Sequence, residues 1–288
     1  MSFQRSGGDE LGEGELRQGR RSQIGRPSFA DEVVVQGGGC DHPAEPECGC
    51  EHLGKTGDVG DLLRRESLPE GALVCTTVQP EGRGQQGTRW LSAPGKNLLA
   101  SFYFRPDFLP LSEVFRLNEI FSLAVSDTVA SFITDEVQIK WPNDIYVNGE
   151  KVAGLLIENT IQGSRIGASI LGVGLNVNET MFPAELPNPV SLAVLTRHQH
   201  EIESVVIELC NHLEHRYLQL KQGKTESLRQ EFIARQYRRG VWALFSDSNG
   251  TFRARFKDIT PEGRLCLEHE DGSVVKYDLK SIRYVLDC

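Results

Sequence analysis

Polar residues at the ends of predicted strands form the set most able to do chemistry. The set is Gln79, Arg83, Lys140, Asn143, Asp144, Lys151 and Asn176. Several cations with a single carboxylate, and no Ser-His-Asp or Cys-His pairing nearby, indicate charge stabilisation more than nucleophilic catalysis. A lone aspartate beside two lysines also suits Mg²⁺ on a nucleotide, because that ion prefers one or two carboxylates plus phosphate oxygens. The alternative is that Lys140 and Asp144 form a plain hairpin ion pair.

A glycine-rich stretch at 78–98 could close over an anionic, aromatic ligand. Its sequence is VQPEGRGQQGTRWLSAPGKNL. Glycine lets the backbone bend sharply and approach a ligand closely. Arg83 offers a fixed fork for phosphate or carboxylate, and Trp90 offers a flat face for a base. On composition alone, an ordinary polar hairpin connection explains the stretch equally well.

Predicted strands and helices would bring these residues to one place. Apolar strands over 72–79 and 97–104 flank the glycine-rich stretch. Strands 137–141 and 144–147 form a hairpin around a Pro-Asn-Asp tip, and strand 151–158 follows an Asn-Gly turn. Amphipathic helices are predicted over 112–133, 202–222 and 228–237.

A further long strand is predicted within 164–180, and it ends in Gly172, Gly174, Asn176 and Asn178. Glycines near the end of a strand often mark a close approach of the backbone to a ligand. A tight packing contact or a bulge is the alternative.

Composition narrows the classes of protein. The chain has 288 residues, 39% of them hydrophobic, and no apolar run approaches the length of a membrane span. The first residues lack a signal-peptide pattern, so we expect a cytoplasmic protein. The net charge of -9 argues against nucleic acid as a partner, and local cations must hold any anionic ligand. Seven unevenly spaced cysteines predict reduced thiols.

The chain divides into three regions. Residues 1–60 are rich in glycine and have no sustained period, so we interpret them as a disordered or aberrant extension. Their cluster CDHPAEPECGCEH matches no common zinc knuckle, and we expect a thiol-rich tail there. Residues 61–237 hold the predicted ligand-binding elements. Residues 238–288 contain short strands between Asn-Gly, Glu-Gly and Asp-Gly turns, which predicts a small β-barrel.

Three motifs in this order resemble those of biotin protein ligases (biotin–[acetyl-CoA-carboxylase] ligases). They are GRGQQGTRW…PGKNL, KWPNDIYVNGEKVAGLLIE and GVGLNVN. The resemblance covers about 61–288 and is closest to the short form without a DNA-binding domain. It implies an α+β fold in which a class II synthetase-like mixed central sheet with flanking helices precedes an SH3-like β-barrel.

The resemblance also implies a two-step reaction. Biotin and ATP, with Mg²⁺, give biotinyl-AMP and pyrophosphate. A lysine of a biotin carboxyl carrier domain of a carboxylase then takes the biotin. The family resemblance leaves a monomer or a homodimer open, and no membrane partner is expected.

Residue roles follow from the same resemblance. On the biotin side it implies Gln79, Arg83, Gly84, Gln85 and Lys151. On the ATP or adenylate side it implies Trp90, Lys140, Asn143 and Asn176. The catalytic charges would be Lys151, Arg83 and Asp144, of which Lys151 bridges the biotin carboxyl and the α-phosphate. Asp144 would serve Mg²⁺ and could help the acceptor lysine to lose its proton.

Two departures from the family pattern concern residues that bind biotin. Many members have Arg where this chain has Gln85, so that contact is neutral here. The family's Asp-Ser-Thr-Asn segment corresponds to LGKTGDVG near 53–60, where Thr56 is the only hydroxyl, and we expect weaker biotin binding. The alternatives are a non-catalytic remnant that binds biotinyl-adenylate, or a lipoate or octanoate ligase or transferase. The acidic charge disfavours a transcriptional repressor.

Overall fold

A mixed seven-stranded sheet forms the centre of the computed structural model, which describes residues 33–36, 69–76, 82–279 and 281–285. The strand order is β1-β2-β5-β9-β8-β7-β6. The strands are β1 (Val33–Gln36), β2 (Leu73–Thr76), β5 (Leu98–Phe104), β6 (Val137–Lys140), β7 (Asp144–Val147), β8 (Glu150–Gln162) and β9 (Arg165–Leu175). β1 pairs with β2 in parallel and the other neighbours are antiparallel. This confirms the predicted mixed sheet.

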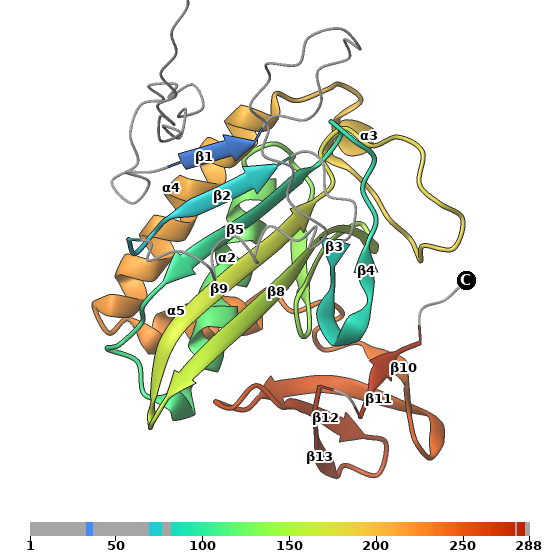
Figure 1. Ribbon diagram of the computed structural model, residues 1–288. Coiled ribbons are helices and arrows are strands. Elements are labelled where there is room, and N and C mark those ends of the chain that lie inside the picture. The colour runs from blue at the N-terminus through green and yellow to red at the C-terminus, as the bar shows by residue number, and fades with distance from the viewer. Residues whose placement is uncertain (1–32, 37–68, 77–81, 280, 286–288) are drawn as a thin grey trace, which may run out of the picture.

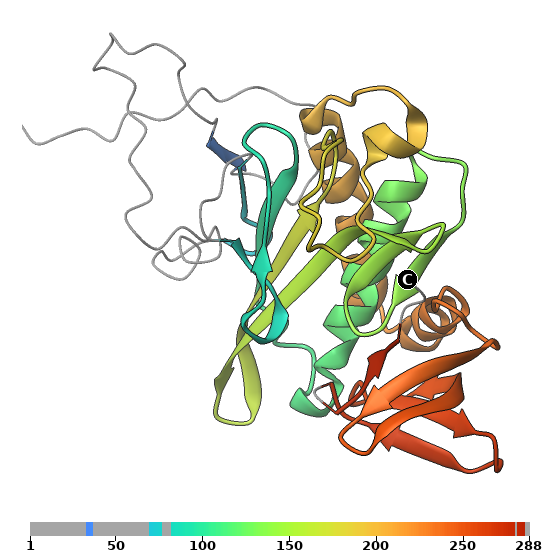
Figure 2. The ribbon, with the colours of Figure 1, turned by 90° about the vertical axis from the view of Figure 1, so that its right-hand side faces the viewer.

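Three long helices cover one face of this sheet (Figures 1 and 2). They are α2 (Phe115–Ala130), α4 (Ile202–Lys221) and α5 (Thr225–Ala234), and a short α3 spans Leu192–Thr196. Leu117, Ile120 and Phe121 of α2 are fully buried because they recur at helical spacing on the side that faces the sheet. The helices leave the opposite face for a small hairpin, β3 (Gly82–Arg83) and β4 (Arg89–Trp90), which lies over the sheet in Figure 2.

A second sheet of five strands forms the C-terminal barrel. Its order is β13-β12-β11-β10-β14. The strands are β10 (Trp242–Asp247), β11 (Gly250–Ile259), β12 (Leu265–His269), β13 (Val274–Tyr277) and β14 (Arg283–Tyr284). Ile259, Leu265 and Leu267 are fully buried inside it. The barrel packs below the main sheet, against the helix layer and the tip of the β6–β7 hairpin (Figure 1).

Most elements predicted from sequence between 97 and 277 are present, with shifted ends. The last helix begins at Thr225, three residues before the predicted start at 228, and β8 continues to Gln162. The pattern did not predict the two-residue strands β3, β4 and β14 or the short α3, because these elements are too brief to show a period.

The N-terminal region differs in one respect from the expectation of no regular element. Val33–Gln36 forms the edge strand β1, in line with the β-branched character of its valines. The cysteine and histidine cluster and the 53–60 segment lie outside the described residues. Among the residues that the structure describes, no helix has both the length and the apolar character of a membrane span.

Two glycines of the barrel allow a test of its packing. Gly263 has a φ of +90°, and a methyl group there would lie 2.3 Å from Cδ2 of Phe115. Gly272 has a φ of +82°, but nothing lies within 4 Å of its methyl position. We expect Gly263→Ala to lower the free energy of unfolding by about 2–5 kcal/mol and Gly272→Ala by about 1–2 kcal/mol, since both strain the backbone but only the first adds a clash. Urea denaturation measures both, and equal losses would contradict the packing described.

Candidate active site

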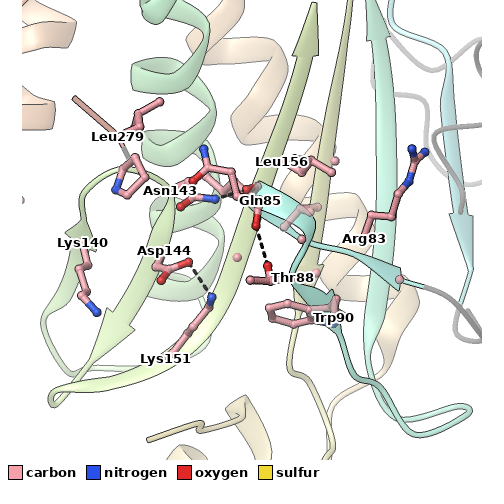
Figure 3. Close-up of a pocket in the computed structure, with 18 of the residues that line it drawn as sticks. Arg83, Gln85, Thr88, Trp90, Lys140, Asn143, Asp144, Lys151, Leu156 and Leu279 are labelled. Atoms are coloured by element: carbon pink, nitrogen blue, oxygen red, sulfur yellow. Dashed lines mark hydrogen bonds and ion pairs between the residues drawn. The ribbon is translucent and has the colours of Figure 1, made fainter. Parts of the chain in front are cut away.

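A cavity of about 440 Å³ lies where the β3–β4 hairpin, the sheet and the barrel meet. Strands β8 and β9 form its floor, the tip of the β6–β7 hairpin forms a wall, and β3, β4 and the connecting 3-10 turn (Gln85–Gly87) cover it. Figure 3 shows the polar side chains that line it. It gathers eight of the ten residues that the sequence assigned to a site: Arg83, Gly84, Gln85, Trp90, Lys140, Asn143, Asp144 and Lys151.

An ion pair crosses the cavity floor. Lys151 Nζ lies 2.7 Å from Asp144 Oδ1, and the two side chains are 29% and 22% exposed. Two hydrogen bonds fix the backbone of Lys151. Its N–H donates to the carbonyl of Asn188, and its carbonyl accepts from the N–H of Val190. The partner of Asp144 is therefore Lys151 on β8, and the alternative of a plain Lys140–Asp144 hairpin pair is wrong.

Lys140 occupies an aromatic corner beside this pair. Its Nζ lies 3.0 Å from the hydroxyl of Tyr146 and 4.7 Å from the centre of that ring. The ring of Tyr284, from the barrel, lies 5.5 Å away. The pKa of Lys140 is lowered to about 8, mainly by burial; the charge of Asp144 opposes this shift, and the charges of Lys151 and Arg238 add to it. The cavity thus holds one lysine in an ion pair and a second that loses its proton near pH 8.

Asn143 fixes the tip of the hairpin onto β8. Its side-chain Nδ2 donates to the carbonyl of Leu155, and its own carbonyl accepts the N–H of Leu155 at 2.9 Å. The residue is only 8% exposed. These bonds to β8 hold the neighbouring Asp144 in place.

Trp90 lies on a floor made of glycine. Gly154 and Gly174 face each other across β8 and β9. A methyl group on Gly174 would lie 2.4 Å from Cε2 of Trp90, and one on Gly154 would lie 2.9 Å from Cζ3. The indole can rest there only because both positions lack a side chain. Its Nε1 is buried and has no hydrogen-bond partner among the described residues, and Lys151 Nζ lies 5.5 Å from the ring centre.

A tight turn shapes the loop above this floor. The N–H of Gly84 donates to the carbonyl of Thr88 at 2.7 Å, and Thr88 returns two bonds to the carbonyl of Gln85. A methyl group on Gly84 would lie 2.4 Å from Oγ1 of Thr88, so this position requires glycine. Arg83 is exposed, and Figure 3 shows it pointing away from the Lys151–Asp144 pair. The loop brings Gln85 to the cavity and leaves Arg83 at its outer side.

Of the predicted site residues that the structure describes, Asn176 is not brought to the cavity. Asn176 is 5% exposed, and its Nδ2 donates to the carbonyl of Val190 at 3.0 Å. It does not line the cavity, and its role toward adenine stays a prediction. Gln79 lies outside the described residues. The described part of the chain contains no group of three or more His, Cys, Asp or Glu that could hold a metal ion.

The barrel supplies a wall that the sequence did not predict. Its contribution comes from Phe245, Leu265, Leu279, Ile282, Arg283 and Tyr284. These residues lie more than 90 positions after the hairpin tip, and no local pattern indicates such a contact. The only signals in the sequence for this wall are the charge and the aromatic ring in the final strand, and these signals are weak.

One phosphate-binding pattern also occurs in the N-terminal part of the sequence. GCEHLGKT at 49–56 fits the P-loop spacing G-x-x-x-x-G-K-[ST]. A P-loop requires a strand before it and a helix after it. These residues lie outside the described part of the chain, and we assign no phosphate site to them.

Comparison with known proteins identifies the family. Residues 55–176 match the Biotin/lipoate A/B protein ligase family, and residues 245–284 match the Biotin protein ligase C terminal domain. The chain is 31% identical to the Bifunctional ligase/repressor BirA of Bacillus spizizenii over 226 residues, which cover 76% of this chain and 68% of that one. It is 30% identical to the Biotin--[acetyl-CoA-carboxylase] ligase of Mycobacterium tuberculosis, with 77% and 84% covered.

Solved structures agree on the fold. The biotin protein ligase from Aquifex aeolicus, in complex with biotin and ATP, superposes with a TM-score of 0.67 at 21% identity, covering 79% of this chain and 95% of that one. The fold, the C-terminal barrel and the extended sequence similarity lead to one conclusion. The chain belongs to the biotin protein ligase family.

Proposed function

We propose that the protein is an ATP-dependent biotin ligase. A carboxylate oxygen of biotin attacks the α-phosphorus of ATP, and the bond to pyrophosphate breaks to leave biotinyl-AMP. The amine of an acceptor lysine, after losing a proton, attacks the acyl carbon, and the bond to AMP breaks. The observation that carries the proposal is the Lys151–Asp144 pair beside the glycine floor, in a chain about 30% identical to named biotin ligases over most of its length.

Lys151 is the catalytic cation in this proposal. Negative charge grows on the α-phosphate oxygens during the first step, and a fixed cation in a partly dry cavity stabilises it more than water does. Asp144 holds the Lys151 ammonium at 2.7 Å before a ligand binds, which limits the reorganisation needed at reaction. In the second step Asp144 could accept the proton of the acceptor lysine.

The covering loop completes the two substrate sites. Gln79, Arg83, Gly84 and Gln85 are proposed to contact biotin, with Arg83 turning inward as the loop closes. Trp90 would stack on adenine, and Asn143 and Lys140 would serve the phosphates. Asn176 is proposed to bind adenine through a group that its bond to Val190 leaves available.

Mg²⁺ fits this site as an ion carried by the nucleotide. The cavity offers two lining carboxylates, Asp144 and Glu158. Mg²⁺ is held well by one or two carboxylates with phosphate oxygens, so Asp144 would supply the protein ligand. When bound, the ion would neutralise phosphate charge.

The acceptor in this proposal is a lysine of a biotin carboxyl carrier domain, because two relatives are biotin–[acetyl-CoA-carboxylase] ligases. We propose a cytoplasmic enzyme, since the reaction consumes ATP, that acts as a monomer or homodimer without nucleic acid. The matched family also includes lipoate ligases, and a non-catalytic adenylate-binding remnant is the other alternative.

One set of assays separates these functions. Purified protein should exchange labelled pyrophosphate into ATP when biotin is added and should label a carrier domain with biotin. Exchange with lipoate or octanoate in place of biotin would favour the lipoate alternative. Biotinyl-AMP retained by the protein, without any labelled carrier, would favour the remnant.

Removing the proposed catalytic cation tests the first step directly. We expect Lys151→Met to lower the rate of biotin-dependent exchange by about 100- to 1,000-fold, the usual loss for one group that stabilises developing charge. Lys151→Arg keeps the charge and should retain part of the rate. Lys276→Met, at an exposed position of β13, is the matched control and should behave as wild type. Normal exchange in Lys151→Met would remove Lys151 from the mechanism.

The lowered pKa of Lys140 predicts a pH dependence. In the free protein the ammonium that would attract ATP phosphates disappears as the pH rises through about 8. We therefore expect kcat/KM for ATP to fall above that pH, because this parameter follows the free enzyme. Lys140→Arg stays charged and should remove that fall. A pH profile that is identical in the two proteins would show that another group titrates.

The glycine floor predicts a selective effect on the nucleotide. Gly174→Ala pushes the Trp90 indole from its place, and we expect KM for ATP to rise by about 5- to 150-fold, the range of a lost stacking contact. Gly167→Ala is the matched control on the same strand, because its methyl group would meet only the flexible side chain of Gln162. Equal KM values for the two variants would contradict the proposed place of Trp90.

A further inference from the structure

The floor of the cavity continues beyond the glycine pair under Trp90. The registers of β5, β9 and β8 align their residues in rows across the sheet, and three successive rows line the cavity. Side chains alternate along a strand, so these rows point away from the core that the helices cover. In order along the sheet, the rows are Leu99, Gly174 and Gly154, then Ser101, Gly172 and Leu156, then Ile170 and Glu158.

Ser101 places a buried polar group in the second row. The residue is 6% exposed and lines the cavity, and its Oγ lies 3.6 Å from the position that a methyl group on Gly172 would take. Within the described part of the chain, this hydroxyl has no hydrogen-bond partner. A buried hydroxyl without a partner costs free energy, which a hydrogen bond to a ligand would recover. The setting of Ser101 is therefore that of a ligand contact.

Ser169 on the neighbouring strand β9 shows the contrast. It is fully buried, and its Oγ donates to Oδ1 of Asn159 at 2.6 Å. Ser169 does not line the cavity. The sheet thus bonds a serine that lies away from the cavity and leaves unbonded the serine that faces it.

The second and third rows lie where the head of biotin would reach. Lys151 Nζ, the proposed partner of the biotin carboxylate, lies 3.2 Å from the methyl position of Gly154 in the first row. A strand rises about 3.3 Å per residue, so the second row lies about 7 Å further along and the third about 13 Å. Leu156 of the second row lies above Trp90 in Figure 3. The saturated chain of biotin is about as long as two strand residues, so the bicyclic head would lie over the second row with its urea toward the third.

We infer that Ser101 recognises the urea group of biotin, with Glu158 as a second contact on the same face of the sheet. The Ser101 hydroxyl donates to the urea carbonyl, and the Glu158 carboxylate accepts an N–H of the urea. The inference rests on the proposed function, because it takes the acid to be biotin. The segment near 53–60, from which the family resemblance would take hydroxyls for the biotin ring, contains only Thr56 in this chain. A hydroxyl from the sheet therefore matters more here.

These contacts would let the cavity select biotin over an acid of the lipoate type. The urea group offers one strong acceptor and two N–H donors, whereas the head of lipoate offers only weakly accepting sulfur atoms. A site that bonds a polar head rejects an analogue without that head, because the polar groups of the site are then left unpaired. Ser101 and Glu158 are thus the specificity-determining residues in this inference.

Two variants and a matched control test the inference in the full-length protein. Ser101→Ala should raise KM for biotin in pyrophosphate exchange by roughly 3- to 30-fold, the range of a lost hydrogen bond in a buried site, and leave KM for ATP unchanged. Glu158→Gln keeps the shape and removes the charge, and it should also raise KM for biotin. Ser169→Ala, at the buried serine away from the cavity, should keep the KM values of wild type.

An analogue of biotin identifies the group that Ser101 contacts. Dethiobiotin keeps the urea and lacks the sulfur. In calorimetric titrations, Ser101→Ala should raise the Kd of dethiobiotin by the same factor as the Kd of biotin. An increase for biotin alone would place the hydroxyl at the sulfur and overturn the inference.

The outcomes separate this inference from the proposed function. Equal KM for biotin in wild type and Ser101→Ala would overturn the inference and leave the ligase activity standing. Absence of biotin-dependent exchange in the wild-type protein would overturn the function instead. Calorimetric titration of biotin into the same variants then tests the inference by itself, and a Kd equal to that of wild type would overturn it.

Discussion

The ion pair between Lys151 and Asp144 is the interaction on which the rest of the site depends. It joins the hairpin strand β7 to β8, and Asn143, next to Asp144, is bonded to β8 as well. A net charge of -9 gives the protein no general attraction for phosphate, so a few local cations must supply it. The fold meets this need by holding one cation against a carboxylate and burying the other among aromatic rings.

The cavity has two kinds of surface, and each has a different structural role. Under Trp90 the sheet gives a floor from which side chains are absent, since Gly154 and Gly174 leave room for a large flat ring. The hairpin tip and the barrel give walls that are densely packed and bonded. A bare floor admits planar groups of several kinds, whereas the walls fix the charges, so specificity for the reacting atoms comes mainly from the walls.

Much of the fold and part of the site could be predicted, because short stretches of the sequence carry the patterns that indicate them. The Asn148-Gly149 turn and the β-branched runs around it located the hairpin, and that placed Lys140, Asp144 and Lys151 within reach of one another. The true partner of Asp144 could not be predicted, since a register shift between Ile145 and Tyr146 decides how the two strands align.

Contacts over long distances along the chain were equally hidden. The side-chain amide of Asn176 donates to the carbonyl of Val190. Val190 lies in an irregular segment, and no sequence pattern indicates this contact. The wall that the barrel forms depends on how the barrel packs against the main sheet and its helices. Periodicity in the sequence describes the elements of each part separately. Motif resemblance supplied the roles of single residues but not these shared surfaces.

At the hairpin tip, the indole Nε1 of Trp141 donates to the carbonyl of Gly263 in the barrel, and this bond has a consequence for biosynthesis. Its acceptor is made 122 residues after its donor, and the ring of Tyr284 follows later still. Domains fold in the order in which they leave the ribosome, so the main sheet can assemble while the hairpin tip still lacks its outer support. The hairpin tip next to Lys140 would then gain its contact with the barrel only at the end of translation.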